Sequence, residues 1–130
     1  MNRVDEQAYK LVLEKEDASI DLIASDNDKL RQSIFDMKHM GKNKLVLSHD
    51  VSQLNPIDKL EVLKLVRDFK TFTSGDDPWG EHDFGSFDFK DIKYFWKIDY
   101  YDNDLKFHSE DKLNAEKTIK VLTVLRASEY

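Results

Sequence analysis

Glu81, His82 and Asp83 are consecutive in the sequence, and their side chains suit acid–base or metal chemistry. In an extended segment, alternate side chains point the same way, so Glu81 and Asp83 would together hold a metal ion or flank a water molecule. His82 would point to the opposite side and could donate a hydrogen bond to a carboxylate. Three further acids could join the cluster: Asp76, Asp77 and Asp99. One hypothesis is therefore a metal-dependent hydrolase that uses Glu81, His82, Asp83 and Asp99.

The same cluster also has a structural interpretation. Polar side chains of this kind readily bond the backbone of tight loops, and residues 81–83 directly precede a predicted hairpin. In this interpretation Gly80 and Gly85 serve backbone geometry and the packing of Trp96. The sequence leaves both interpretations open.

Other catalytic patterns are weaker. Asp77 followed by Asp88-x-Lys90 resembles a nuclease pattern that holds magnesium, but Lys90 falls at a predicted turn and an acidic surface would repel nucleic acid. The chain has no cysteine and no G-x-S-x-G elbow, and its four histidines lack a metal-ligand partner at helical spacing. No cofactor is expected.

The segment from Asp76 to Asp104 concentrates charge and aromatic residues. It holds nine acids and three lysines, so its net charge of −6 equals that of the whole chain, and it holds nine of the 15 aromatic residues. Aromatic residues bordered by charges are typical of protein–protein interfaces. The residues assigned to this predicted partner-binding surface are Asp76, Asp77, Trp79, Glu81, Asp83, Phe95, Asp99, Tyr101 and Asp102.

Two helices are predicted in the first third of the chain. Residues 3–15 place apolar side chains at helical spacing, and residues 27–39 do so again. Ser25 or Asp26 could cap the second helix, and Gly41 could end it.

In the middle of the chain, the residue pattern predicts a short strand at residues 44–48, followed by a further helix. Asn55 is suited to the N-cap of that helix, and Pro56 is suited to its first position, where the missing N–H costs nothing. The apolar spacing continues to Phe69, after which turn-forming residues indicate a loop over 71–80.

A β-hairpin is predicted at about residues 84–101, with a two-residue turn at Lys90-Asp91. This register places Asp88 opposite Lys93, a favourable pair on one face. It gathers the large apolar side chains on the other face: Phe87, Phe89, Ile92, Tyr94, Trp96 and Ile98. Phe95 and Tyr101 then lie beside Lys97 and Asp99, where they are exposed if no helix covers that side.

The C-terminal segment predicts a helix from Asn114 to about Ser128, although its β-branched residues also suit a strand. The fold class that follows is α+β, with a small, mainly antiparallel sheet (the hairpin and the strand at 44–48) packed by three to four helices. We expect a single domain at residues 22–130, preceded by a helical extension at residues 1–21.

Composition narrows the class of protein further. The chain of 130 residues is 40% hydrophobic and 35% charged, as expected of a folded domain. It contains no apolar stretch that would span a membrane or form a signal peptide, so a cytoplasmic location is expected. A pI near 5.2 argues against direct nucleic-acid binding.

Three segments are specific in combination: DDPWGEHDFG (76–85), YFWKIDYYD (94–102) and VLTVLRASEY (121–130). They resemble the motifs DNDPxGEHDFG, FWKIDYYD and VLTxxLAxEY of a bacterial family of domains of unknown function that is common in proteobacteria and on their plasmids. The family has Asp-Gly where this chain has Lys90-Asp91, which supports the hairpin turn. Its proline at the position of Ala115 would suit the first turn of the predicted C-terminal helix. The resemblance implies no established activity.

Two hypotheses of function follow. The first is a non-enzymatic, acidic protein-binding module whose segment 76–104 contacts a basic protein partner. The association of the resembling family with mobile elements implies that this partner belongs to a host defence or DNA-handling machine that the module inhibits. The second is the metal-dependent hydrolase described above. No membrane contact is expected, and the sequence leaves the oligomeric state open.

Overall fold

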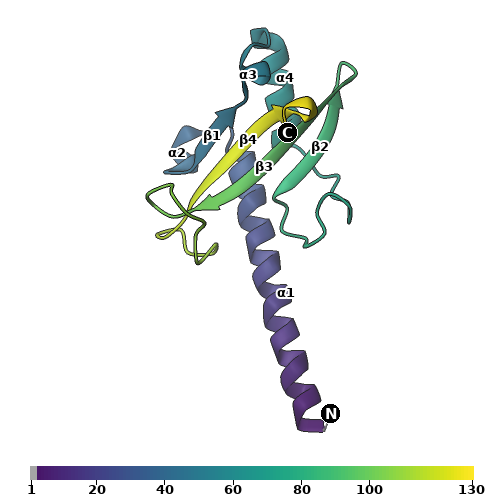
Figure 1. Cartoon of the computed structure of the whole chain (residues 1–130), viewed down its shortest axis with the longest axis vertical. Coiled ribbons are helices and arrows are strands. Elements are labelled where there is room, and N and C mark those ends of the chain that lie inside the picture. The colour runs from purple at the N-terminus through teal and green to yellow at the C-terminus, as the bar shows by residue number, and fades with distance from the viewer. Residues whose placement is uncertain (1–2) are drawn as a thin grey trace.

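The computed structural model describes residues 3–130, with the side chains of residues 7, 8, 10 and 17–130. A four-stranded sheet packs against helices on one of its faces (Figure 1). The helices are α1 (Arg3–Gln32), α2 (Met37–Met40), α3 (His49–Ser52) and α4 (Pro56–Arg67). The strands are β1 (Lys44–Leu47), β2 (Phe84–Phe89), β3 (Ile92–Tyr101) and β4 (Ile119–Arg126), and a 3-10 turn, η1 (Ala127–Glu129), follows. The described part of the chain contains no helix that is long and apolar enough to cross a membrane.

The strand order is β1-β4-β3-β2. β3 is antiparallel to both of its neighbours, whereas β1 is parallel to β4. The predicted α+β class with a mainly antiparallel sheet is confirmed. The last strand in sequence lies between the first and the third, so the sheet is complete only when the end of the chain has been inserted.

The predicted hairpin is confirmed together with its register. Gly85 pairs with Trp96 and Asp88 with Lys93, as expected from the two-residue turn. Lys90 and Asp91 have φ angles of 49° and 65°, so both central residues are left-handed, as a type I′ turn requires.

The predicted C-terminal helix is wrong. Residues 119–126 form β4, and only η1 after it is helical. In the sheet, Leu122 pairs with Leu45 of β1 on one side and with Ile98 of β3 on the other. This pairing on two sides outweighs the local helical spacing, because β-branched residues fit a buried strand well.

The first predicted helix and the second one as far as Gln32 form a single helix, α1; the remainder of the second is a turn followed by α2. α1 continues through Ser25 and Asp26, which were expected to cap a new helix, since residues 16–26 contain neither glycine nor proline to end it. Met37, one of the apolar residues of the helix predicted at 27–39, lies in the separate helix α2 and is 84% exposed. The expected start of α4 is confirmed: the side chain of Asn55 accepts a hydrogen bond of 2.8 Å from the backbone N of Asp58.

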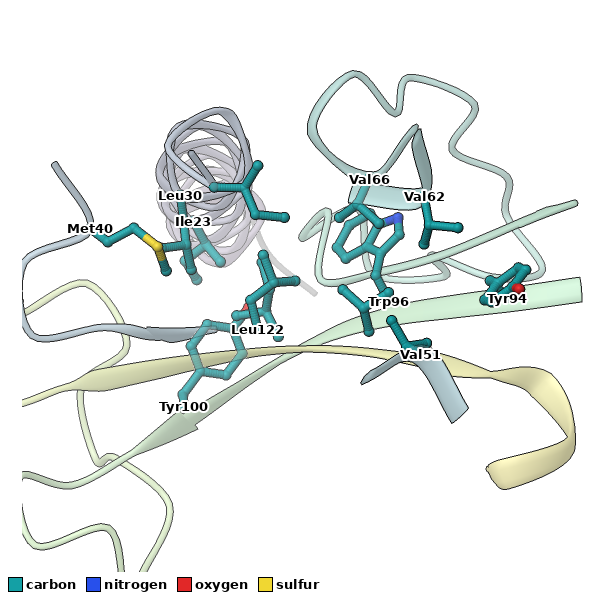
Figure 2. Close-up of a cluster of buried hydrophobic side chains, with 13 residues drawn as sticks. Ile23, Leu30, Met40, Val51, Val62, Val66, Tyr94, Trp96, Tyr100 and Leu122 are labelled. Atoms are coloured by element: carbon teal, nitrogen blue, oxygen red, sulfur yellow. The ribbon is translucent and has the colours of Figure 1, made fainter. Parts of the chain in front are cut away.

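The core lies between the sheet and helices α1 and α4 (Figure 2). Trp96 is fully buried at its centre, and the ring of Phe69 contacts it edge-on with 5.5 Å between centroids. The indole occupies the space beside Gly85, where a Cβ atom would lie 2.2 Å from Nε1 of Trp96. Position 85 therefore requires glycine, because the indole of Trp96 occupies the space that a side chain would need. This is the role in packing Trp96 that the structural interpretation predicts for Gly85.

Candidate functional site

The loop before β2 is held by Asp77. Asp77 is buried, and both of its carboxylate oxygens lie 3.3 Å from the backbone N of His82, which donates to them. Gly80 and His82 have φ angles of 70° and 55°, so the chain turns sharply here. Residues 81–83 are therefore not an extended segment, and the alternation of side chains assumed from the sequence does not apply.

His82 points toward α1. Its ring stacks on Phe72 with 3.7 Å between centroids, and its Nδ1 lies 3.0 Å from Oδ1 of Asp28. The same oxygen of Asp28 accepts a hydrogen bond of 2.6 Å from Nη2 of Arg31. His82 thus joins the loop to α1 through one shared carboxylate.

Arg31 is the buried cation of this group. Its Nη1 donates to the carbonyl oxygens of Val66 and Phe69 at the C-terminal end of α4, at 3.0 and 2.9 Å. Its guanidinium lies 4.8 Å from the centroid of the Trp96 ring. Burial lowers the pKa of Arg31 from its ordinary value, and Asp28 acts in the opposite direction. A cation suits the negative end of the α4 dipole, so Arg31 fixes α4 against α1.

A second polar group surrounds Tyr100 on the helix-covered face of the sheet. Asn27 is fully buried, and its Nδ2 donates to the hydroxyl oxygen of Tyr100 at 2.7 Å and to the carbonyl oxygen of Glu81 at 3.0 Å. The Tyr100 hydroxyl donates in turn to the Glu81 carboxylate at 3.3 Å. Lys112 forms an ion pair of 3.2 Å with Glu81. Lys120 donates to Oδ1 of Asn27 at 2.8 Å.

The ionisation of this network is shaped by burial. The pKa of Asp83 is raised to about 6. Burial is the largest cause, and the negative charges of Glu81 and Asp77 add to it. Burial also raises the pKa of the Tyr100 phenol above its ordinary value, so it stays a neutral donor. Burial lowers the pKa of Lys120, although Asp26 partly opposes this shift.

The opposite face of the sheet has no helix on it among the described residues, since α1 and α4 both lie behind the sheet in the view of Figure 1. We call it the uncovered sheet face; by strand register it consists of Lys44, Val46, Phe84, Ser86, Asp88, Lys93, Phe95, Lys97, Asp99, Tyr101, Ile119, Val121, Thr123 and Leu125. The C-terminal turn folds over part of it, where Tyr130 contacts Phe95 and Phe84 with 5.5 and 6.2 Å between ring centroids. At another part of the face, His108 of the loop after β3 stacks on Tyr101 with 6.1 Å between centroids. Phe84 and Phe95 are themselves 5.0 Å apart. This aromatic cluster remains accessible, since Tyr130 is 77% exposed.

The residues assigned to a partner-binding surface fall into separate regions. Phe95, Asp99 and Tyr101 lie together on the uncovered sheet face, where Asp99 forms an ion pair of 2.8 Å with Lys97. Five others lie in the loop before β2: Asp76, Asp77, Trp79, Glu81 and Asp83. In that loop Trp79 is 76% exposed, whereas Asp77 is buried. Asp102 follows β3 and accepts a hydrogen bond of 3.1 Å from the backbone N of Lys106.

The residues of the hydrolase hypothesis are also divided. Asp99 lies on the uncovered sheet face, whereas Glu81 contacts Tyr100 on the helix-covered face. No group of three or more His, Asp or Glu residues with a metal-binding arrangement occurs in the described part of the chain. Lys90, the lysine of the nuclease-like pattern, lies in the hairpin turn and forms an ion pair of 3.0 Å with Asp58.

Four buried polar residues were not anticipated from the sequence: Asn27, Arg31, Thr118 and Lys120. Asn27 and Arg31 lie in a helix that looked amphipathic through its leucines and isoleucines, and nothing local marks them as buried. The burial of Lys120 follows once the segment is recognised as a strand, because residues 120, 122 and 124 then lie on the same face, which Leu122 and Val124 mark as the core side.

The fold and these groups define a class: a small α+β domain with helices on one face of its sheet and an accessible aromatic cluster on the other. The chain matches the model of the family described as protein of unknown function (DUF3768) over residues 47–129, more than half of its length, and it belongs to that family. No curated protein and no solved structure matches the chain. The domain boundary at residues 21 and 22 stays a prediction; α1 crosses it without a break, and buried side chains begin at Ile23.

Proposed function

We propose that the protein is a non-enzymatic binding module whose uncovered sheet face contacts a partner protein. The observation that carries this proposal is the cluster of Phe84, Phe95 and Tyr130 on a sheet face without a covering helix. Aromatic anchors at the centre of a patch, with charged residues around them, are what a protein interface requires. The charged residues of the face are three lysines and two aspartates: Lys44, Lys93, Lys97, Asp88 and Asp99.

The partner has a basic surface in this proposal. The uncovered sheet face itself has three lysines and two aspartates, so the attraction comes from the chain as a whole. Its net charge of −6 attracts a cationic partner over a distance and speeds the association. An acidic module of this kind can occupy a site that otherwise holds nucleic acid. We extend the proposal on this basis to an inhibitor of a host defence or nucleic-acid-handling protein.

The proposal is tested by capturing partners of the tagged protein from a lysate of its own host and identifying them by mass spectrometry. Tyr130→Ala and Phe95→Ala each remove one aromatic anchor from the uncovered sheet face. Phe35→Ala is the matched control, because Phe35 is a partly exposed aromatic residue in the turn after α1 that contacts Arg67. We expect one partner that the wild type and the Phe35 variant retain and that both face variants lose while keeping their circular dichroism and thermal midpoint.

A second arm separates the uncovered sheet face from the loop before β2. Trp79→Ala changes the exposed aromatic residue of that loop. Loss of the partner in the Trp79 variant alone would move the interface to the loop, and retention of the partner in every variant would overturn the proposal. A charge-reversal variant for the binding assay should be made at the exposed Asp88. The same change at the buried Asp77 would disrupt the loop, because the Asp77 carboxylate accepts a hydrogen bond from the backbone N of His82.

A further inference from the structure

A pocket lined by lysines lies on the helix-covered side of the molecule. Its volume is about 400 Å³, and it is formed by the C-terminal half of α1, by α2 and by residues 112–120. We call it the lysine pocket after four of its lining residues: Lys29, Lys42, Lys112 and Lys120. Asp26 is the one acid among the described residues that line it, so the formal charge of the lining is +3 in a protein whose net charge is −6.

Lys120 is the residue that distinguishes this pocket from an ordinary basic surface. It is 9% exposed, and its Nζ donates to the amide oxygen of Asn27 at 2.8 Å. No described carboxylate forms an ion pair with it. A buried ammonium group with a neutral partner loses hydration that one amide does not replace. An anion in the pocket would supply the missing charge.

The other lysines leave most of the positive charge uncompensated. Lys42 donates to two neutral oxygens, Oδ1 of Asn103 at 2.8 Å and the carbonyl of Glu116 at 3.2 Å. Lys29 forms no ion pair with any described residue, whereas Lys112 is paired with Glu81. Three of the four ammonium groups therefore form no ion pair with a described carboxylate, although Asp26 acts on Lys120 at longer range.

The chemistry of the lining indicates the class of anion. No arginine lines the pocket, so bidentate binding of a carboxylate by a guanidinium has no partner among its described residues. The one aromatic ring of the lining is the imidazole of His39, whose Nδ1 is paired with Asp36. The hydroxyl groups of Ser33 and Thr118 already donate to the backbone carbonyls of Lys29 and Asp111. The lysines therefore supply the contacts, and lysines act as point charges on phosphate oxygens. We propose that the lysine pocket binds a small phosphorylated anion with at least two negative charges.

The test uses the full chain and pyrophosphate as the probe, with calorimetry for affinity and amide NMR shifts for location. We expect wild type to bind with shifts centred on residues that line the pocket. Lys120→Met should weaken binding about tenfold, because it removes a charged contact from a largely desolvated position. Lys29→Gln should weaken binding about threefold, as its charge is exposed to solvent.

Lys117→Gln is the matched control, since Lys117 is exposed in the same segment and does not line the pocket. It removes the same charge and should leave the affinity unchanged. Lys29→Gln keeps the proposal testable if Lys120→Met fails to fold, because Lys29 is exposed. Citrate provides a carboxylate anion of similar charge and should bind at least tenfold more weakly than pyrophosphate.

The proposal is overturned if wild type gives neither heat nor shifts with pyrophosphate, if citrate binds as tightly, or if Lys117→Gln weakens binding as much as Lys29→Gln. The lysine pocket and the uncovered sheet face lie on opposite sides of the sheet. Loss of partner capture in the Tyr130 variant and loss of pyrophosphate in the Lys29 variant therefore report on separate sites, and either proposal can fail alone.

Discussion

Gly85 and Trp96 show how a single residue fixes the position of the neighbouring elements. The indole of Trp96 lies in the space that any side chain at residue 85 would need, and it is in turn contacted by Phe69 and by the guanidinium of Arg31. A change at one glycine is therefore transmitted to the hairpin, to α4 and to α1. Close packing leaves no room for the ring to move aside.

Replacing Gly85 by alanine should lower the free energy of unfolding by about 3 kcal/mol, since overpacking a fully buried site forces side chains from their preferred rotamers. The measurement is chemical denaturation followed by tryptophan fluorescence. Gly75→Ala is the control, because the nearest atom to a Cβ at Gly75 is 4.0 Å away. Equal stability of the two variants would show that Trp96 is not packed as described.

The sequence predicted the roles of individual residues in the candidate sites less well than it predicted the fold. The role of Gly85 beside Trp96 was predictable, because the register of one hairpin brings the two residues together. The burial of Asn27, Arg31 and Lys120 was not predictable, since apart from Asp28 beside Arg31 their partners lie 35 or more residues away along the chain. Burial of a polar side chain depends on contacts between distant segments, which no local pattern records.

At the scale of elements, the hairpin was predictable because two independent patterns agree on its register. The apolar side chains fall on one face, and the pair of Asp88 and Lys93 falls on the other. The C-terminal segment had only one local pattern, and that pattern suits a helix and a strand equally. Its true state depends on parallel pairing with β1, which lies more than 70 residues earlier in the chain.

The hairpin turn keeps two residues in a conformation that glycine adopts more readily. Asp91→Gly should raise the free energy of unfolding by about 0.5–1 kcal/mol, because the φ of Asp91 is 65° and glycine carries no Cβ penalty there. Thermal unfolding measures the effect. Asp104→Gly makes the same change at an exposed residue without a positive φ, and it should be neutral or slightly destabilising. A drop in stability for Asp91→Gly would contradict the left-handed turn.

At the scale of the whole molecule, α1 extends well beyond the sheet (Figure 1). A helix of 30 residues is about 45 Å long. Among its described side chains, those that are buried lie between Ile23 and Arg31. The described side chains before Ile20 are all exposed. The folded unit and the projecting part of α1 are therefore separable in principle.

A chain that begins at Ala18 should retain the stability of the full chain to within about 0.5 kcal/mol, because the described side chains that it removes are exposed. Leu30→Ala is the contrasting variant: Leu30 is 5% exposed, and its truncation should cost about 2–5 kcal/mol. The shortened chain also tests where the partner binds. If it folds and captures the same partner as the full chain, the interface lies within residues 18–130, as binding through Phe95 and Tyr130 requires. If it folds and loses the partner, the projecting part of α1 contributes to the interface, and the uncovered sheet face is not sufficient for binding.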